Sequence, residues 1–127
     1  MLTVTKRFEF CYGHCLPEHP GKCKNIHGHN CTLEVTVTRR DGRERVPETG
    51  MVVDFGDIKK IVDPFIQQLD HQFINKVLPE KYLPPTAESL ALWFHQQLHL
   101  AFQFPLTVVR VRVYETKDSY AESTVIL

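Results

Sequence analysis

An alternation of polar and apolar side chains along residues 26–39, strict from residue 31 to 38, constrains the fold more than any other feature of the chain. The polar positions are mostly threonines, and the apolar positions are Cys31, Leu33, Val35 and Val37. Because successive side chains of a β-strand point to opposite faces, this pattern predicts a strand with one buried face and one polar face. A sheet of such strands needs a second layer over its apolar face.

Three other stretches are predicted to be strands of the same sheet. Residues 3–10 alternate in the same way, residues 106–115 carry valines at every second position, and residues 120–126 form a final strand. Residues 51–55 are expected to add a further short strand.

Two segments between these strands have the spacing of amphipathic helices. Residues 56–69 carry apolar side chains at helical intervals, and Pro64 is expected to kink or divide this helix. Thr86 is a good N-cap for a second helix that ends near residue 101. His95 and His99, one turn apart on that helix, are interpreted as surface residues. The expected buried stripe of the second helix is Leu90, Trp93, Phe94 and Leu98.

The order of these elements predicts the fold class. A chain of 127 residues with 43% hydrophobic content suits one domain, which we expect to span residues 1–127. Strand, strand, two helices, strand, strand is an α+β arrangement, with two helices on one face of a four-stranded antiparallel sheet. The edges of such a sheet are usually blunted, covered or paired, so we expect association with another subunit through them.

Composition excludes several classes of partner. The formal net charge is zero and the basic residues are scattered, which argues against a nucleic-acid or membrane-surface partner. No apolar run approaches the roughly 18 residues of a membrane-spanning helix. The first residues lack the pattern of a signal peptide, so we expect a cytoplasmic location. In that reducing compartment the four cysteines are expected to be free thiols.

A histidine pair makes a metal site the first functional hypothesis. His27 and His29 project to the same side of the predicted strand, and Gly28 leaves space between them. His14 would complete three nitrogen ligands, the set that leaves one position of a zinc ion open, as catalytic sites do. His19 competes with His14 for the third ligand position, and packing histidines are the structural alternative.

Cys23 is the candidate acid/base beside that metal. Lys22 and Lys24 flank it, and two cations with a nearby zinc ion favour the thiolate. The same lysines are weak candidates for contacts with an anionic substrate. Asp70 and His71 follow the first helix and could relay the proton of Cys23. The structural alternative for His71 is a favourable interaction with the dipole at the helix C-terminus. The other three cysteines are interpreted as small packing residues.

Glu115 is unusual because it ends an apolar row. Val109, Val111 and Val113 are expected to share one face of their strand, and Glu115 continues that row. A carboxylate in this position either lies at an open strand end or is buried and has a functional role. The sequence leaves both alternatives open.

Six segments occur in a fixed order over nearly the whole chain and together resemble the 6-pyruvoyltetrahydropterin synthase superfamily. They are residues 10–14, 23–29, 49–55, 69–71, 85–91 and 114–116. The chain is most similar to the bacterial branch of queuosine biosynthesis, the 6-carboxytetrahydropterin synthases. The three residues between Cys23 and His27 resemble that branch, whereas a branch with glutamate in place of the cysteine is disfavoured.

The resemblance implies a tunnelling fold, in which subunits join their sheets into an oligomeric barrel and stack as a hexamer of two trimers. It also implies Zn2+ bound by His14, His27 and His29. Cys23 would then be the residue that transfers protons.

The resemblance further implies how the substrate is held. Asp70 and His71 would form the relay with the cysteine, reaching it across a subunit boundary. Glu115 would anchor the pterin ring through its amino and ring N–H groups, with help from Thr86 and Glu88.

The implied reaction converts 7,8-dihydroneopterin triphosphate to 6-carboxy-5,6,7,8-tetrahydropterin, with loss of acetaldehyde and triphosphate. Two alternatives are a 6-pyruvoyltetrahydropterin synthase, which eliminates triphosphate and keeps the side chain, and a zinc-stabilised pterin-binding module without turnover. One departure from the family pattern is the run Cys11-Tyr12-Gly13 before His14, where small residues are more usual. We expect this run to alter the pocket for the substrate side chain.

Overall fold

A single mixed sheet forms one layer of the computed structural model, which describes residues 1–125. Its strand order is β3-β1-β2-β4-β5. The elements are β1 (Val4–His14), β2 (His27–Arg39), β3 (Gln72–Phe73), β4 (Leu106–Thr116) and β5 (Ser119–Thr124).

The four long strands pair antiparallel as predicted. The expected four-stranded sheet is corrected to five strands, because β3 adds a two-residue parallel pairing with β1. Residue 126, the expected end of the last strand, lies outside the described residues.

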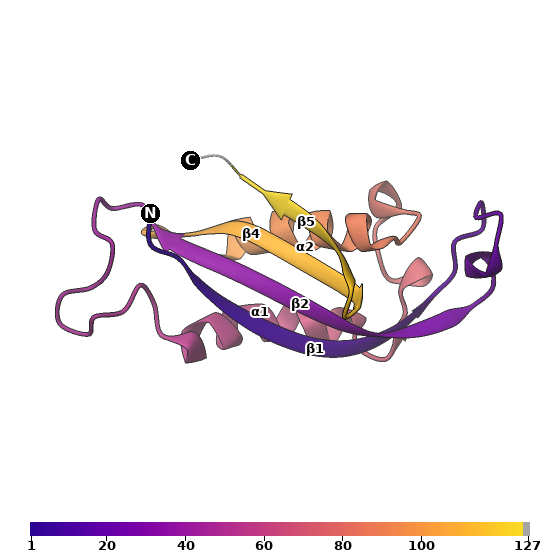
Figure 1. Ribbon diagram of the computed structural model, residues 1–127, viewed down its shortest axis with the longest axis horizontal. Coiled ribbons are helices and arrows are strands. Elements are labelled where there is room, and N and C mark those ends of the chain that lie inside the picture. The colour runs from indigo at the N-terminus through magenta and orange to yellow at the C-terminus, as the bar shows by residue number, and fades with distance from the viewer. Residues whose placement is uncertain (126–127) are drawn as a thin grey trace.

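Two helices form the second layer, and Figure 1 shows both on the same side of the sheet. They are α1 (Phe55–Leu69) and α2 (Ala87–Ala101), with three short 3-10 turns, η1 (Lys22–Lys24), η2 (Ile74–Lys76) and η3 (Glu80–Tyr82). As predicted, the Thr86 hydroxyl caps α2 by accepting from the Ser89 N–H at 3.1 Å. No helix within residues 1–125 combines the length and apolar character needed to cross a membrane.

Helix α1 corrects two expectations. The helix is continuous through Pro64, so the expected division is wrong. Pro64 and Lys60 are both exposed, and water can therefore satisfy the carbonyl that loses its helical partner. Residues 51–55 form no strand, because the Asp54 side chain accepts from the Gly56 N–H at 2.6 Å and Phe55 already begins the helix.

The core lies between the two layers. The apolar row of β2 is fully buried, and so is the stripe of α2, both as predicted. They meet the buried face of α1, which is formed by Ile58, Val62, Ile66 and Leu69. The interpretation of His95 as a surface residue is wrong, because only 4% of it is exposed. Its Nδ1 lies 2.8 Å from the Ser123 hydroxyl and its Nε2 3.2 Å from the Val108 carbonyl, so packing of α2 on β4 and β5 buries it with both nitrogens paired.

A β-bulge changes which valines of β4 face the helices. The register between β2 and β4 shifts from Thr36 opposite Arg110 to Val37 opposite Val108, which leaves Val109 as the extra residue. Val108 therefore joins Val111 and Val113 in the core cluster in place of Val109. The expectation that Val109 shares their face is wrong, since a bulge inverts the side-chain alternation on one side of it.

Candidate metal centre and active site

Three histidines meet where the β1–β2 ribbon extends past the end of β4. The pairing of β2 with β4 ends at Thr32, so residues 27–31 of β2 have only β1 beside them in the sheet. The β1–β2 register places His14 opposite His27 and Tyr12 opposite His29, which brings His14, His27 and His29 to one face. Their ligating atoms all lie within 4.8 Å of one another. This face is the one that the helices cover.

Hydrogen bonds to backbone carbonyls set the proton positions of two of these rings. His14 Nδ1 lies 2.8 Å from the Pro85 carbonyl, and His27 Nδ1 lies 2.7 Å from the Asn25 carbonyl. A carbonyl only accepts, so each Nδ1 carries the hydrogen and each neutral ring presents a lone pair at Nε2. The carbonyls thus orient both rings as outer partners orient metal-binding histidines.

These lone pairs face one another so closely that they repel each other unless a cation lies between them. The Nε2 atoms of His14 and His27 are 2.8 Å apart, and those of His29 and His14 are 3.1 Å apart. Burial lowers the pKa of His14, and the neighbouring His27 and His29 act in the same direction, so protonation of His14 is disfavoured. Three neutral nitrogen donors directed at one point fit a divalent transition metal such as zinc. His19 is not part of the cluster.

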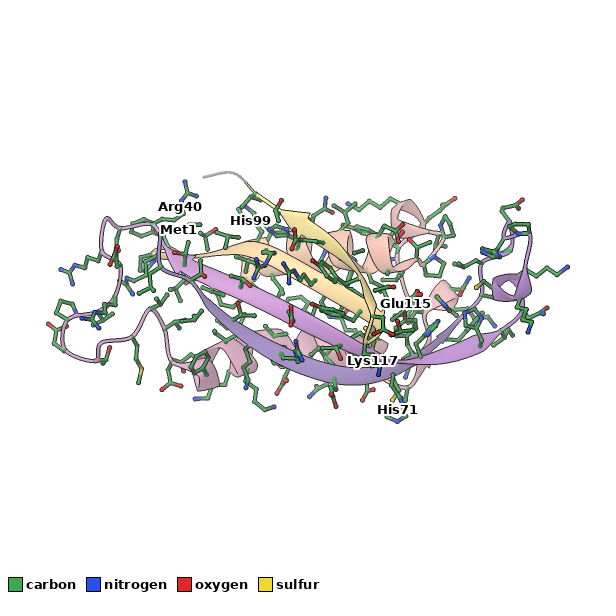
Figure 2. All side chains as sticks on the ribbon, in the orientation of Figure 1. Met1, Arg40, His71, His99, Glu115 and Lys117 are labelled. Atoms are coloured by element: carbon green, nitrogen blue, oxygen red, sulfur yellow. The ribbon has the colours of Figure 1, made fainter. Side chains whose placement is uncertain are left out.

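Glu115 lies beside the cluster at the end of β4 (Figure 2). Its carboxylate is 4.0 Å from His29 Nε2, and 31% of its side chain is exposed, which favours the open strand end over full burial. Glu115 and Glu88 line one cavity of about 470 Å3. Thr86 does not line this cavity, and its hydroxyl caps α2. The structure thus brings together two of the three residues expected to hold a pterin.

Cys23 lies on η1. Figure 1 shows the loop that joins β1 to β2 and contains this turn. The side chain is partly exposed, and the Cys23 carbonyl accepts from the Leu16 N–H at 2.7 Å. Cys23 is not a member of the ligand cluster formed by the three histidines. This placement is compatible with a group that acts beside a metal without binding it.

Asp70 and His71 form a pair at the C-terminal end of α1. The Asp70 carboxylate accepts from the Cys11 N–H at 3.0 Å and lies 3.0 Å from His71 Nδ1. The Cys11 N–H lowers the pKa of Asp70, with His71 acting in the same direction. His71 has a positive φ of 60° and a side chain that is 78% exposed, and Figure 2 shows it pointing away from the sheet. Its ring nitrogen Nε2 is therefore open to another molecule.

The four cysteines are all free thiols within the described residues. Cys31 is buried in the core as expected. Cys11 is corrected, because it lies on the face without helices and its thiol donates to Asn30 Oδ1 at 2.9 Å. Its position follows from strand parity, since Phe10 and Tyr12 on either side of it face the helices.

Sequence reasoning missed Pro85 as a contributor to the site, and it named Tyr12 only as part of the run before His14. The Pro85 carbonyl is 71 residues from His14, and no local pattern could pair them. Tyr12 had a signal, because it shares the strand parity of Phe10 and His14. It is only 3% exposed, and burial raises the pKa of its hydroxyl, with Cys31 and Glu115 acting in the same direction.

Comparisons with known proteins agree on one family. The model of the family described as 6-pyruvoyl tetrahydropterin synthase matches residues 3–124. The chain is 37% identical over 102 residues to a 6-carboxy-5,6,7,8-tetrahydropterin synthase of Synechocystis sp., covering 80% of this chain and 78% of the relative. It is 31% identical over 141 aligned positions to the enzyme of the same name from Haemophilus influenzae, covering 96% of this chain and 98% of that one.

A solved structure is similar over nearly the whole chain. The Caenorhabditis elegans 6-pyruvoyl tetrahydropterin synthase superposes with a TM-score of 0.84 at 25% identity. The match covers 98% of this chain and 96% of the other.

Proposed function

The chain belongs to the 6-pyruvoyl tetrahydropterin synthase family, and we propose that it converts 7,8-dihydroneopterin triphosphate to 6-carboxy-5,6,7,8-tetrahydropterin. Acetaldehyde and triphosphate would be released, and the product would serve as a queuosine precursor. The observation that carries this proposal is the cluster of three histidine Nε2 atoms beside the Glu115 carboxylate. The names of relatives that are 31% and 37% identical support this product over the pyruvoyl compound.

The metal in this proposal is zinc held by His14, His27 and His29. When bound, it would supply Lewis-acid polarisation of the hydroxyl groups on the substrate side chain. The Pro85 and Asn25 carbonyls keep the first two rings in the tautomer that binds a metal.

Cys23 is proposed as the base that removes a proton from the carbon beside a substrate hydroxyl and later returns it. Asp70 orients His71, and His71 exchanges the proton with Cys23 of another subunit. Exposure of the His71 side chain supports this role, because the ring is free to meet a neighbouring chain. The redox change is internal to the substrate, so no nicotinamide is required.

Glu115 is proposed to anchor the pterin ring. A carboxylate accepts hydrogen bonds from the ring N–H and amino groups. Glu88 lines the same cavity, and Thr86 supports the position of Glu88 by capping the helix on which Glu88 lies.

Glu115→Gln should weaken binding of pterin, because a donor amide replaces part of the acceptor. Unchanged affinity by calorimetry would remove Glu115 from the site.

A homohexamer of two trimers is proposed as the active assembly. The edge strand β5 and the part of β1 before Tyr12 have no further strand beside them in the described chain. Pairing of these edges between copies would extend the sheet into a barrel. The free cysteines are compatible with a cytoplasmic location.

The test is a product assay with zinc-loaded protein and 7,8-dihydroneopterin triphosphate. Equal amounts of acetaldehyde and triphosphate are expected. Triphosphate without acetaldehyde would instead indicate a 6-pyruvoyltetrahydropterin synthase, the function named for the similar Caenorhabditis elegans structure. Binding of pterin with neither product would indicate the non-catalytic zinc-stabilised module.

A further inference from the structure

Tyr12 lies against the three-histidine cluster, although the function proposed above assigns it no role. Only 3% of its surface is exposed. The centroid of its ring is 5.2 Å from that of His14 and 5.7 Å from that of His29. Tyr12 is therefore part of the wall of the site, in contact distance of two proposed ligands.

The Tyr12 hydroxyl is buried and has no hydrogen-bond partner among residues 1–125. An unpaired buried hydroxyl destabilises the folded protein, whereas phenylalanine would bury the same ring without that penalty. The buried Tyr82, far from the histidines in sequence, does have a partner, since its hydroxyl donates to Gln96 Oε1. The difference points to a contact of Tyr12 that forms when a ligand is present.

Glu115 is a charged acceptor that lies beside the same histidine as Tyr12. Tyr12 pairs with His29 across the β1–β2 register, and the Glu115 carboxylate lies 4.0 Å from Nε2 of the same histidine. The carboxylate is also one of the groups that raise the pKa of the Tyr12 hydroxyl. Tyr12 and Glu115 thus approach each other beside one ring of the cluster.

We propose that Tyr12 is a positioning residue that holds the Glu115 carboxylate in the orientation that binds a pterin ring, an inference that rests on the function proposed above. A carboxylate has two oxygen atoms with about four lone-pair positions, so it accepts from the pterin and from the Tyr12 hydroxyl at the same time. Donation from Tyr12 forms as the pterin binds, and it holds the carboxylate in its bound orientation. The complex is therefore more stable than one in which Glu115 contacts the pterin alone.

Tyr12→Phe tests this role, because it removes the hydroxyl and keeps the ring. We expect the Kd of unsubstituted pterin, measured by calorimetry on zinc-loaded protein, to rise about tenfold, since hydrogen bonds to charged groups are the stronger ones. KM for 7,8-dihydroneopterin triphosphate should rise by a similar factor while kcat and zinc content stay near wild type. The melting temperature without ligand should not fall, because an unpaired buried hydroxyl is removed.

Tyr82→Phe is the matched control. It removes a paired hydroxyl from a buried tyrosine outside the site. The expected result is a lower melting temperature and an unchanged Kd for pterin. The two substitutions should therefore have opposite patterns of effect on stability and binding.

A double-mutant cycle with Glu115→Ala separates this inference from the proposed function. Tyr12→Phe should weaken pterin binding in the wild type but cause no further loss once the Glu115 acceptor is absent. Wild-type affinity in Tyr12→Phe, or an equal loss in both backgrounds, would overturn the role of Tyr12 and leave the proposed function standing. Failure of the wild type to bind pterin would overturn both.

Discussion

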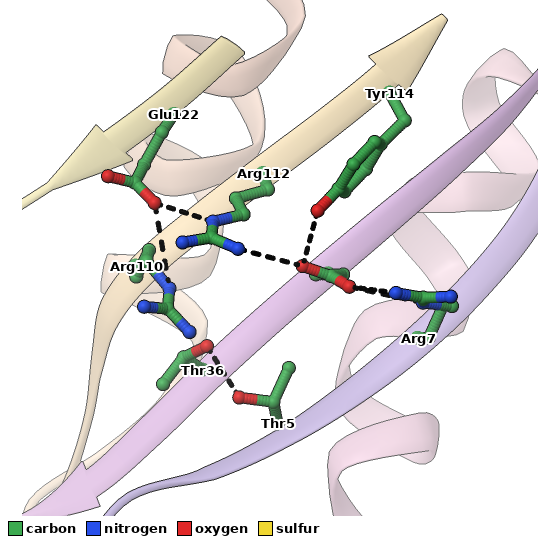
Figure 3. A network of polar contacts seen from close by, with 8 residues as sticks. Thr5, Arg7, Thr36, Arg110, Arg112, Tyr114 and Glu122 are labelled. Carbon is green, nitrogen blue, oxygen red and sulfur yellow. Dashed lines mark hydrogen bonds and ion pairs between the residues drawn. The ribbon is translucent and has the colours of Figure 1, made fainter. Parts of the chain in front are cut away.

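The two faces of the sheet use alternate residues of the same strands, yet they carry different chemistry. The face covered by α1 and α2 is apolar along its length and changes to histidine only where the β1–β2 ribbon passes the end of β4. The open face is polar, and its charged groups pair across strands (Figure 3). There Glu34 accepts from Arg7 Nε at 3.1 Å and lies 3.8 Å from Arg112, which in turn donates to Glu122 at 2.6 Å.

The difference shows how each face keeps polar groups stable. On the open face Glu34 is only 7% exposed without any helix above it, because long arginine and tyrosine side chains cover it. On the covered face His14 is buried, whereas His27 and His29 are partly exposed where the β1–β2 ribbon passes the end of β4, so a ligand can approach the cluster from that side. We therefore expect substitutions on the covered face to change metal binding and stability strongly, and substitutions on the open face to have small effects.

The largest expected effect comes from His14→Ala, which removes the central histidine of the cluster. Zinc affinity should fall by more than about 100-fold, since loss of an outer partner of a ligand alone already costs 10- to 100-fold. Metal content of dialysed protein measures this loss, and turnover should be undetectable. His99→Ala, on the exposed side of α2, should retain zinc. Full metal content in His14→Ala would remove this histidine from the proposed metal site.

Cys23→Ala should lower kcat by about 100- to 10,000-fold, the range for loss of a general acid/base. Zinc content should be unchanged, because Cys23 is outside the histidine cluster. Cys15→Ala is a suitable control, since the structure uses the Cys15 backbone to bind Asn75 and not its thiol. Near-normal turnover of Cys23→Ala would contradict its role as the base.

Phe94→Ala probes the covered face away from the metal. Phe94 is fully buried and packs against Phe10 and Trp93, so the variant should lose about 3–5 kcal/mol of unfolding free energy. Urea unfolding at one protein concentration measures the loss. Leu100→Ala on the exposed side of the same helix should change stability by no more than about 0.5 kcal/mol. Similar losses in the two variants would contradict the assignment of the core.

Glu34→Gln probes the open face. The substitution keeps the shape of the side chain but removes the charge that pairs with Arg7 and Arg112, so unfolding free energy should fall by about 1 kcal/mol. Zinc content and kcat should not change. A loss as large as that of Phe94→Ala would show that the open face stabilises the fold as much as the core does.

A pH dependence of stability is expected from His95. Burial lowers its pKa below 6.5, so the unfolded chain binds a proton at a higher pH than the folded chain does. The unfolding free energy is therefore highest above about pH 6.5. It decreases as the pH falls below that value, by at most about 1.4 kcal/mol per pH unit for one proton. Melting temperatures between pH 8 and pH 5 should fall less steeply for His95→Gln than for wild type. His99→Gln should keep the wild-type slope, and identical slopes in all three proteins would exclude His95.

Local patterns were sufficient to predict most of the scaffold. Strand parity correctly placed the apolar row of β2 on the covered face, and the Thr86 cap correctly located the start of α2. Parity also put His27 and His29 side by side. These features follow from periods of two and 3.6 residues, which the order of the amino acids carries directly.

The errors arose where a distant partner decides the outcome. The two residues of β3 are a strand only because they meet Tyr12 and Gly13. Val109 lies outside the core cluster on the helix-covered face because the register with β2 shifts. His95 is buried because β4 and β5 pack beside it and satisfy both of its nitrogens.

From its order of residues alone, the chain established an α+β scaffold, a histidine pair on a covered strand face and a family resemblance. The tertiary structure added what makes that pair part of a candidate metal centre: the Pro85 carbonyl that sets the tautomer of His14, and the approach of Glu115 to His29. The physical reason is separation along the chain. His14 and Pro85 are 71 positions apart, so their hydrogen bond leaves no trace in any local sequence pattern.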